Sequence, residues 1–188
     1  MKSCSLFLPV LVGTLLSAAT ADAGTLVHIN FEASTRSTNA GGKVVNTPVT
    51  GHKVVRECAR NRAPPVAPAS LALVLDVDSG RVSVVDRATG TNVCEVFQFD
   101  EITSAADADS GYKVRHLRVR DPGAAQSAGS AVANERSSRD DNGVLVKYHL
   151  NGKFHLSYPS VDGSAPKVCN GTFNTGRRFT PTAPVPVQ

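Results

Sequence analysis

The segment Leu71–Phe99 most constrains the fold, because apolar and polar residues alternate along it and two turn sequences interrupt the alternation. Successive side chains of a β-strand point to opposite faces of the sheet, so the pattern predicts three antiparallel strands. A two-residue loop at Ser79-Gly80 would pair Val77 with Val82 and gather the apolar residues of both strands on one face. A second turn carries this face onto a third strand, where Val84 would lie opposite Cys94.

Similar patterns predict further strands elsewhere in the chain. These strands are expected at Thr25–Glu32, His52–Cys58, Tyr112–Arg120 and Val168–Phe173, and as a hairpin at Gly143–Tyr158 with a bulged turn at Asn151-Gly152. Asp100–Ser110 is expected to form a helical turn or a loop. Asp121–Asn142 is expected to form a mobile loop or to contain a short helix around Ala131–Ser137.

These elements together predict an all-β protein without an amphipathic helix. Strand counting gives an antiparallel β-sandwich or an up-and-down barrel of about nine strands. The alternation alone favours neither architecture over the other.

The first residues have the anatomy of a secretory signal. Lys2 precedes the apolar run Leu6–Leu16, and Ala21-Asp22-Ala23 provides small residues for cleavage after Ala23. The apolar run is too short for a membrane-spanning helix, which needs about 20 residues, and no later stretch is apolar enough. We therefore expect a signal peptide over 1–23, a single domain over 24–179 and a disordered, proline-rich tail over 180–188, in a secreted or periplasmic protein.

Three cysteines follow the predicted cleavage site, which indicates one disulfide and one free thiol in an oxidising compartment. Cys94 is expected on the same inward face as Val96. Cys169 lies an even number of residues from Phe173 and is therefore expected on the same face as that residue. The pairing Cys94–Cys169 is therefore favoured, and the two pairings that involve Cys58 remain as alternatives.

The most basic segment of the chain is the strand Tyr112–Arg120. If a bulge at His116 restores the alternation, four cations line one face of this strand, namely Lys113, Arg115, Arg118 and Arg120. Phosphates or cell-wall carboxylates would relieve their mutual repulsion, whereas charges that protect a solvated edge strand from aggregation are the alternative. A nucleic acid is not expected, because the strand lacks aromatic residues for base stacking.

Motifs for catalysis or cofactor binding are missing from the sequence. It contains no Gly-x-Ser-x-Gly nucleophile motif and no His-Glu-x-x-His zinc motif. The acidic segments Asp76–Gly80 and Asp107–Gly111 resemble the start of a calcium loop, but their glycine comes one position too early and an arginine replaces the final glutamate. No enzymatic activity, metal or cofactor is expected.

The sequence is most compatible with an exported, non-enzymatic binding module whose partner is an anionic envelope polymer or a protein. One alternative is an inhibitor or immunity-type protein that blocks a secreted enzyme with a loop, either Arg60–Ser70 or Asp121–Asn142. Another is a structural subunit that assembles by pairing of strand edges.

Overall fold

The computed structural model describes residues 25–39, 41–107, 111–159 and 165–182. The expected signal peptide and residues 183–188 of the expected tail lie outside these ranges. Within them the chain forms nine strands, one α-helix and one 3-10 turn. Their bounds are β1 (Leu26–Thr38), β2 (Val44–Thr50), α1 (Gly51–Asn61), η1 (Pro68–Ser70), β3 (Leu71–Asp76), β4 (Arg81–Asp86), β5 (Asn92–Asp107), β6 (Tyr112–Arg120), β7 (Ala128–Arg139), β8 (Leu145–Tyr158) and β9 (Lys167–Arg178).

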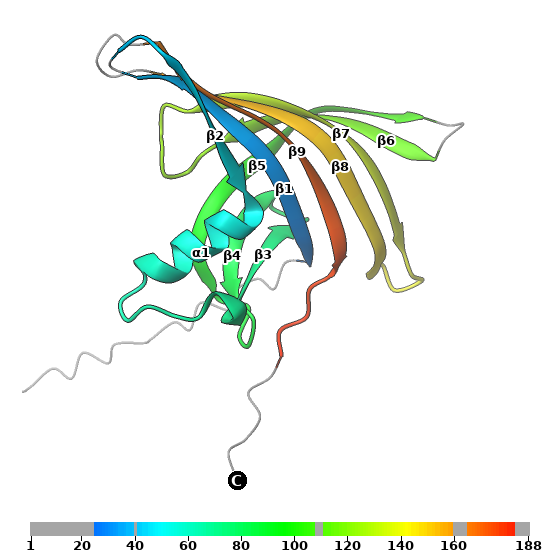
Figure 1. The fold of residues 1–188 in the computed structure, drawn as a ribbon. Coiled ribbons are helices and arrows are strands. Elements are labelled where there is room, and N and C mark those ends of the chain that lie inside the picture. The colour runs from blue at the N-terminus through cyan, green and yellow to red at the C-terminus, as the bar shows by residue number, and fades with distance from the viewer. Residues whose placement is uncertain (1–24, 40, 108–110, 160–164, 183–188) are drawn as a thin grey trace, which may run out of the picture.

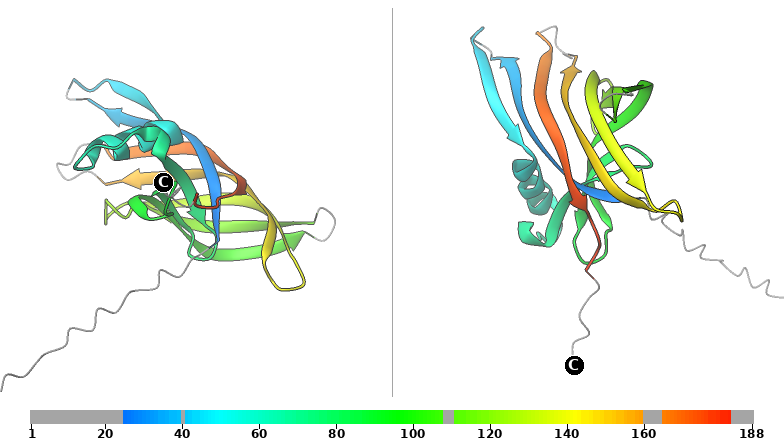
Figure 2. Two further views of the ribbon diagram at one scale, coloured as in Figure 1. Left: turned by 90° about the horizontal axis from the view of Figure 1, so that it is seen from below. Right: turned by 90° about the vertical axis from the view of Figure 1, so that its right-hand side faces the viewer.

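The nine strands form one antiparallel sheet, in the order β2-β1-β3-β4-β5-β6-β7-β8-β9, and β1 also pairs with β9. The β1–β9 pairing closes eight of the strands into a ring, and β2 is attached outside it to the second half of β1. Figures 1 and 2 show the resulting strongly curved sheet. The all-β prediction is confirmed, and of its two architectures the up-and-down barrel is the one that forms.

Aromatic side chains fill the inside of the ring. Five phenylalanines from four strands contact one another there, namely Phe31, Phe97, Phe99, Phe154 and Phe173, with ring centroids 5.0–6.4 Å apart. All five are buried, and burial of a phenylalanine stabilises a fold by about 1.5–3 kcal/mol. The interior is therefore a packed core.

The hairpin β3–β4 has a different register from the predicted one. Val82 lies opposite Leu75, not Val77, because the turn is longer than two residues and closes with a hydrogen bond from the Gly80 N–H to the Asp76 carbonyl oxygen at 2.8 Å. Gly80 has φ +72°, a conformation that favours glycine. The register is shifted by two residues, so every side chain keeps its predicted face, and the prediction that Val84 pairs with Cys94 is confirmed.

Helix α1 replaces the strand expected at His52–Cys58. It begins after Thr50, whose side-chain oxygen accepts a hydrogen bond from the Lys53 N–H at 3.2 Å. Val54, Val55, Cys58 and Ala59 recur at helical spacing and pack against the core. The helix therefore lies against β1, β2, β3 and β5 at the end of the barrel where β3 and β5 begin.

Three other segments are strands where we expected loops or turns. The hairpin expected over Gly143–Tyr158 is the single strand β8, with Gly152 in its middle, where a Cβ would collide with the Val132 carbonyl oxygen on β7. Strand β5 continues to Asp107, so Asp100–Ser110 does not begin as a helical turn. Most of Asp121–Asn142 forms β7, without the helix considered there.

The predicted disulfide is also wrong, because Cys58 bonds to Cys94. The bond links α1 to the start of β5, and Cys169 remains a buried free thiol on β9. In the ring of eight strands, β5 and β9 lie on opposite walls. Cys94 and Cys169 both belong to inward-facing rows, as expected, but the core lies between them.

Candidate functional site

The basic strand β6 does not present its four cations on one face. It pairs with β7 without interruption, and the bulge lies across from it on β5, between Glu101 and Thr103. Uninterrupted alternation puts Lys113 and Arg115 on the inner face with the buried Leu117, and puts Arg118 and Arg120 on the outer face. The expected bulge at His116 and the single basic face are therefore wrong.

Three of these four cations are paired with carboxylates. The Arg115 guanidinium contacts Glu101 at 2.9 Å and Glu135 at 3.4 Å, and Lys113 lies 3.5 Å from Glu101. Arg120 contacts Asp100 at 2.8 Å. Only Arg118 has no ion pair within the described residues. Anion binding by this strand remains a prediction, and it would have to compete with these carboxylates.

Arg115 and its partner Glu101 lie at the end of the barrel opposite α1. They line a cavity of about 270 Å³ that Tyr148 also lines. Burial, together with the charge of Glu135, raises the pKa of Tyr148 above its usual value, so its hydroxyl stays protonated. A hydrogen bond from Ser104 lowers the pKa of Glu101, and the charge of Arg115 acts in the same direction. This end of the barrel is polar, but its charges neutralise one another.

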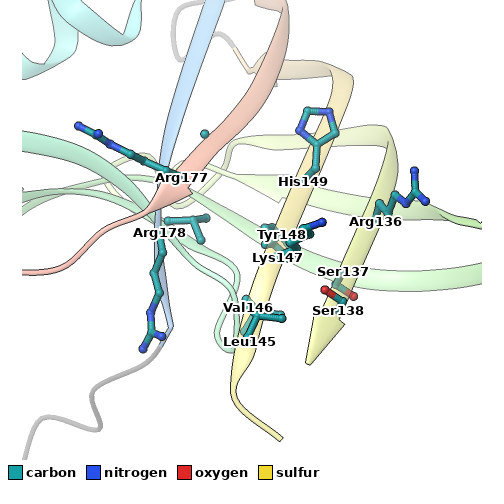
Figure 3. Close-up of a pocket in the computed structure, with 12 residues that line it drawn as sticks. Arg136, Ser137, Ser138, Leu145, Val146, Lys147, Tyr148, His149, Arg177 and Arg178 are labelled. Carbon is teal, nitrogen blue, oxygen red and sulfur yellow. The ribbon is translucent and has the colours of Figure 1, made fainter. Parts of the chain in front are cut away.

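A larger opening lies on the other side of Tyr148, where β8 and β9 separate. Their pairing ends with Asn151 opposite Asn174, yet β8 reaches back to Leu145 and β9 continues to Arg178. The last link between them is a hydrogen bond of 2.8 Å from the Leu150 N–H to the side-chain oxygen of Thr175. Beyond it the strands diverge around a cavity of about 610 Å³ (Figure 3).

Basic residues from three strands are among those that line this cavity, which we call the basic slot, although the side chains of Arg177 and Arg178 extend away from β8. These basic residues are Arg136 of β7, Lys147 and His149 of β8, and Arg177 and Arg178 of β9. Hydroxyl groups and apolar side chains complete the lining, among them Tyr148, Val146 and Leu145. No aspartate or glutamate is among the lining residues, so the basic slot carries an uncompensated positive charge.

The cations of the basic slot have few protein partners. Arg136 lies 5.7 Å over the ring of Tyr112, whereas Lys147, Arg177 and Arg178 make no ion pair or side-chain hydrogen bond with any described residue. The charge of Arg177 reaches His28 on the neighbouring strand. Burial is the main cause that lowers the pKa of His28, and Arg87 and Arg177 lower it further. These guanidinium and ammonium groups are available to an external anion.

Sequence reasoning missed the basic slot because its parts are far apart in the chain. Arg177 and Arg178 lie beyond the strand expected at Val168–Phe173, and Lys147 lies in the expected hairpin that does not form. The doublet Arg177-Arg178 after an alternating segment was the one local signal. Nothing in the sequence shows that β8 and β9 separate beside it.

Other classes of site find no support in the described part of the chain. Its residues contain no group of three His, Cys, Asp or Glu side chains able to hold a metal ion. Of the helices that the structure describes, none is long and apolar enough to cross a membrane. In comparisons with known proteins, the chain matches no family model, no curated protein and no solved structure.

Proposed function

We propose that this protein is an exported, non-enzymatic binding module that holds an anionic partner in the basic slot. The observation that carries the proposal is the composition of the lining, with five basic side chains and no carboxylate around a cavity of about 610 Å³. Cavities of this size are typical of ligand sites.

The electrostatics of the basic slot favour an anion over other ligands. Its lining residues include five basic side chains and no carboxylate, so the site holds no counter-charge of its own. A carboxylate, sulfate or phosphate group would supply that counter-charge, and arginine binds such groups through two parallel hydrogen bonds. Because the interior is filled, the partner must bind from outside the barrel wall.

Two features support export. The predicted signal peptide leads the chain into an oxidising compartment, and the Cys58–Cys94 disulfide is of a kind that persists there. Binding outside the cell or in the periplasm exposes the basic slot to anionic envelope polymers and to other exported proteins.

The proposal is tested with dextran sulfate, a polyanion without peptide groups. We expect the mature chain to be retained on a dextran sulfate column, and the variant Lys147→Gln/Arg178→Gln to elute at clearly lower salt. The matched control is Arg118→Gln/Lys153→Gln, which removes two charges from the outer face away from the basic slot. Equal losses in the two variants, or no retention of the wild-type chain, would overturn the proposal.

A further inference from the structure

The basic slot exposes an unpaired strand edge as well as charge, and we infer that its anionic partner is an extended acidic polypeptide segment that adds to β8 at Tyr148. The inference rests on the proposed function and narrows it from anions in general to a peptide. Three observations lead to it: the direction of the β8 backbone groups, the side chains along that edge, and the shape of the opening.

The backbone of β8 points unpaired groups into the basic slot. Along an antiparallel strand, the N–H and C=O groups of alternate residues point to the same side. The Leu150 N–H points toward β9, because it donates to Thr175. The N–H and C=O of Tyr148, two residues earlier, therefore point to the same side, where the described part of β9 offers no backbone partner.

The opposite edge of β8 is fully used, so this is a true edge and not a distorted loop. Tyr148 lies opposite Ser137 of β7, and the β7–β8 pairing continues to Arg139. A strand with one paired and one open edge is the usual template for β-strand addition, in which the main chain of the peptide supplies most of the affinity.

Side chains along this edge alternate in a way that a peptide strand could match. Lys147 carries a positive charge and His149 is polar, whereas Val146, which is 58% exposed, and Tyr148 offer apolar surface. Opposite charges and apolar pairs stabilise neighbouring strands when they face each other. A peptide that alternates acidic and apolar residues would place its carboxylates near Lys147 and its apolar side chains near Val146.

A small anion would use only part of this site. It could contact a guanidinium group, but it would leave the Tyr148 N–H and C=O without partners and the exposed Val146 uncovered. The residues that line the cavity of about 610 Å³ instead run along β8 from Leu145 to His149, a length that fits an extended segment.

The test compares three short peptides, each acetylated and amidated, by isothermal titration with the mature chain. The first alternates glutamate and valine, the second has the same sequence with N-methyl groups on alternate residues, and the third replaces glutamate with lysine. We expect the first to bind, the second to bind at least about tenfold more weakly because it loses backbone hydrogen bonds, and the third not to bind. Amide exchange of Tyr148 should slow when the first peptide is added.

The outcomes separate this inference from the proposed function. The N-methylated peptide is made in two versions, one methylated at the odd-numbered residues and one at the even-numbered residues. If both versions bind as tightly as the unmethylated peptide, the strand-addition inference is wrong, although anion binding stands. If the acidic peptide fails to bind while dextran sulfate is retained through Lys147 and Arg178, the partner is an anion other than a peptide. If neither acidic peptide nor dextran sulfate binds, the proposed function itself fails.

Discussion

The backbone N–H of Leu150 donates to the side-chain oxygen of Thr175 at 2.8 Å, at the point where β8 and β9 separate. A side chain thus takes the place of the backbone carbonyl that would continue the sheet. Thr175 is 5% exposed and Leu150 is 2% exposed, so water cannot easily replace this bond.

Substitution of Thr175 by valine should therefore destabilise the protein. Thr175→Val keeps the shape of the side chain but leaves the buried Leu150 N–H without an acceptor, which costs about 1–3 kcal/mol. Urea unfolding measures the loss, and amide exchange at Leu150 should become faster. Thr172→Val is the control, because Thr172 is exposed on the same strand. An equal loss in both variants would mean that the hydrogen bond is not the cause.

Removal of the Arg115 charge should be costly near neutral pH. Arg115→Met leaves Glu135, whose side chain is only 11% exposed, without its partner, and breaking a largely buried ion pair costs about 3 kcal/mol. Urea unfolding at neutral pH tests this expectation.

The control for this variant is Arg120→Met. Arg120 pairs with Asp100 at the surface, where the two side chains are 54% and 35% exposed, so its loss should cost at most about 1 kcal/mol. A loss for Arg120→Met as large as that for Arg115→Met would contradict the assignment of Arg115 to a buried network.

His28 should make stability depend on pH. Burial and the charges of Arg87 and Arg177 lower its folded-state pKa below the ordinary value of 6.5. Its contribution to stability is therefore complete above about pH 6.5 and is lost as the pH falls through the folded pKa, because the unfolded chain binds the proton more readily. His28→Phe keeps the edge contact with Phe179 and removes this titration.

The measurement compares the urea midpoints of wild type and His28→Phe at pH 7.5 and 5. The wild-type midpoint should fall more between the two values than that of the variant. His116→Phe, which replaces an exposed histidine on β6, should retain the wild-type difference. If the urea midpoints of wild type and His28→Phe change by the same amount between pH 7.5 and 5, this expectation is wrong.

Reduction of the Cys58–Cys94 bond should weaken the attachment of α1. The bond spans 36 residues, and the chain-entropy model assigns a loop of that size about 4 kcal/mol. Urea unfolding with and without dithiothreitol measures the difference. The variant Cys58→Ser/Cys94→Ser should be as weak as the reduced wild type and should not respond to dithiothreitol. A response of that variant would point to Cys169 instead.

The sequence predicted which face each residue of the central strands occupies, but not their register. A shift of two residues preserves every face, so the positions of Leu75 and Val77 opposite Val82 are equally compatible with the alternation. The longer turn decides between them through the hydrogen bond from Gly80 to Asp76. Alternation within the expected strand Thr25–Glu32 also puts Val27, Ile29 and Phe31 on one face, and all three are buried.

The errors have two physical causes. Val54 and Val55 favour a strand locally, but the Thr50 cap and the docking of Cys58 and Ala59 on the core make the segment helical. Segments such as β7 look like loops because their outer face is solvated and their inner face needs only alanine opposite bulky neighbours. The basic slot depends on long-range pairing of β8 and β9, which local alternation does not encode.

The phenylalanine-filled interior has a consequence for the proposed binding function. A partner bound in the basic slot would not enter the barrel and would stay on its outer wall, with one side exposed to solvent. Another macromolecule could then contact the same partner while it is bound, and the partner could dissociate without any rearrangement of the core. Such a site would present a bound partner to other molecules and would not enclose it.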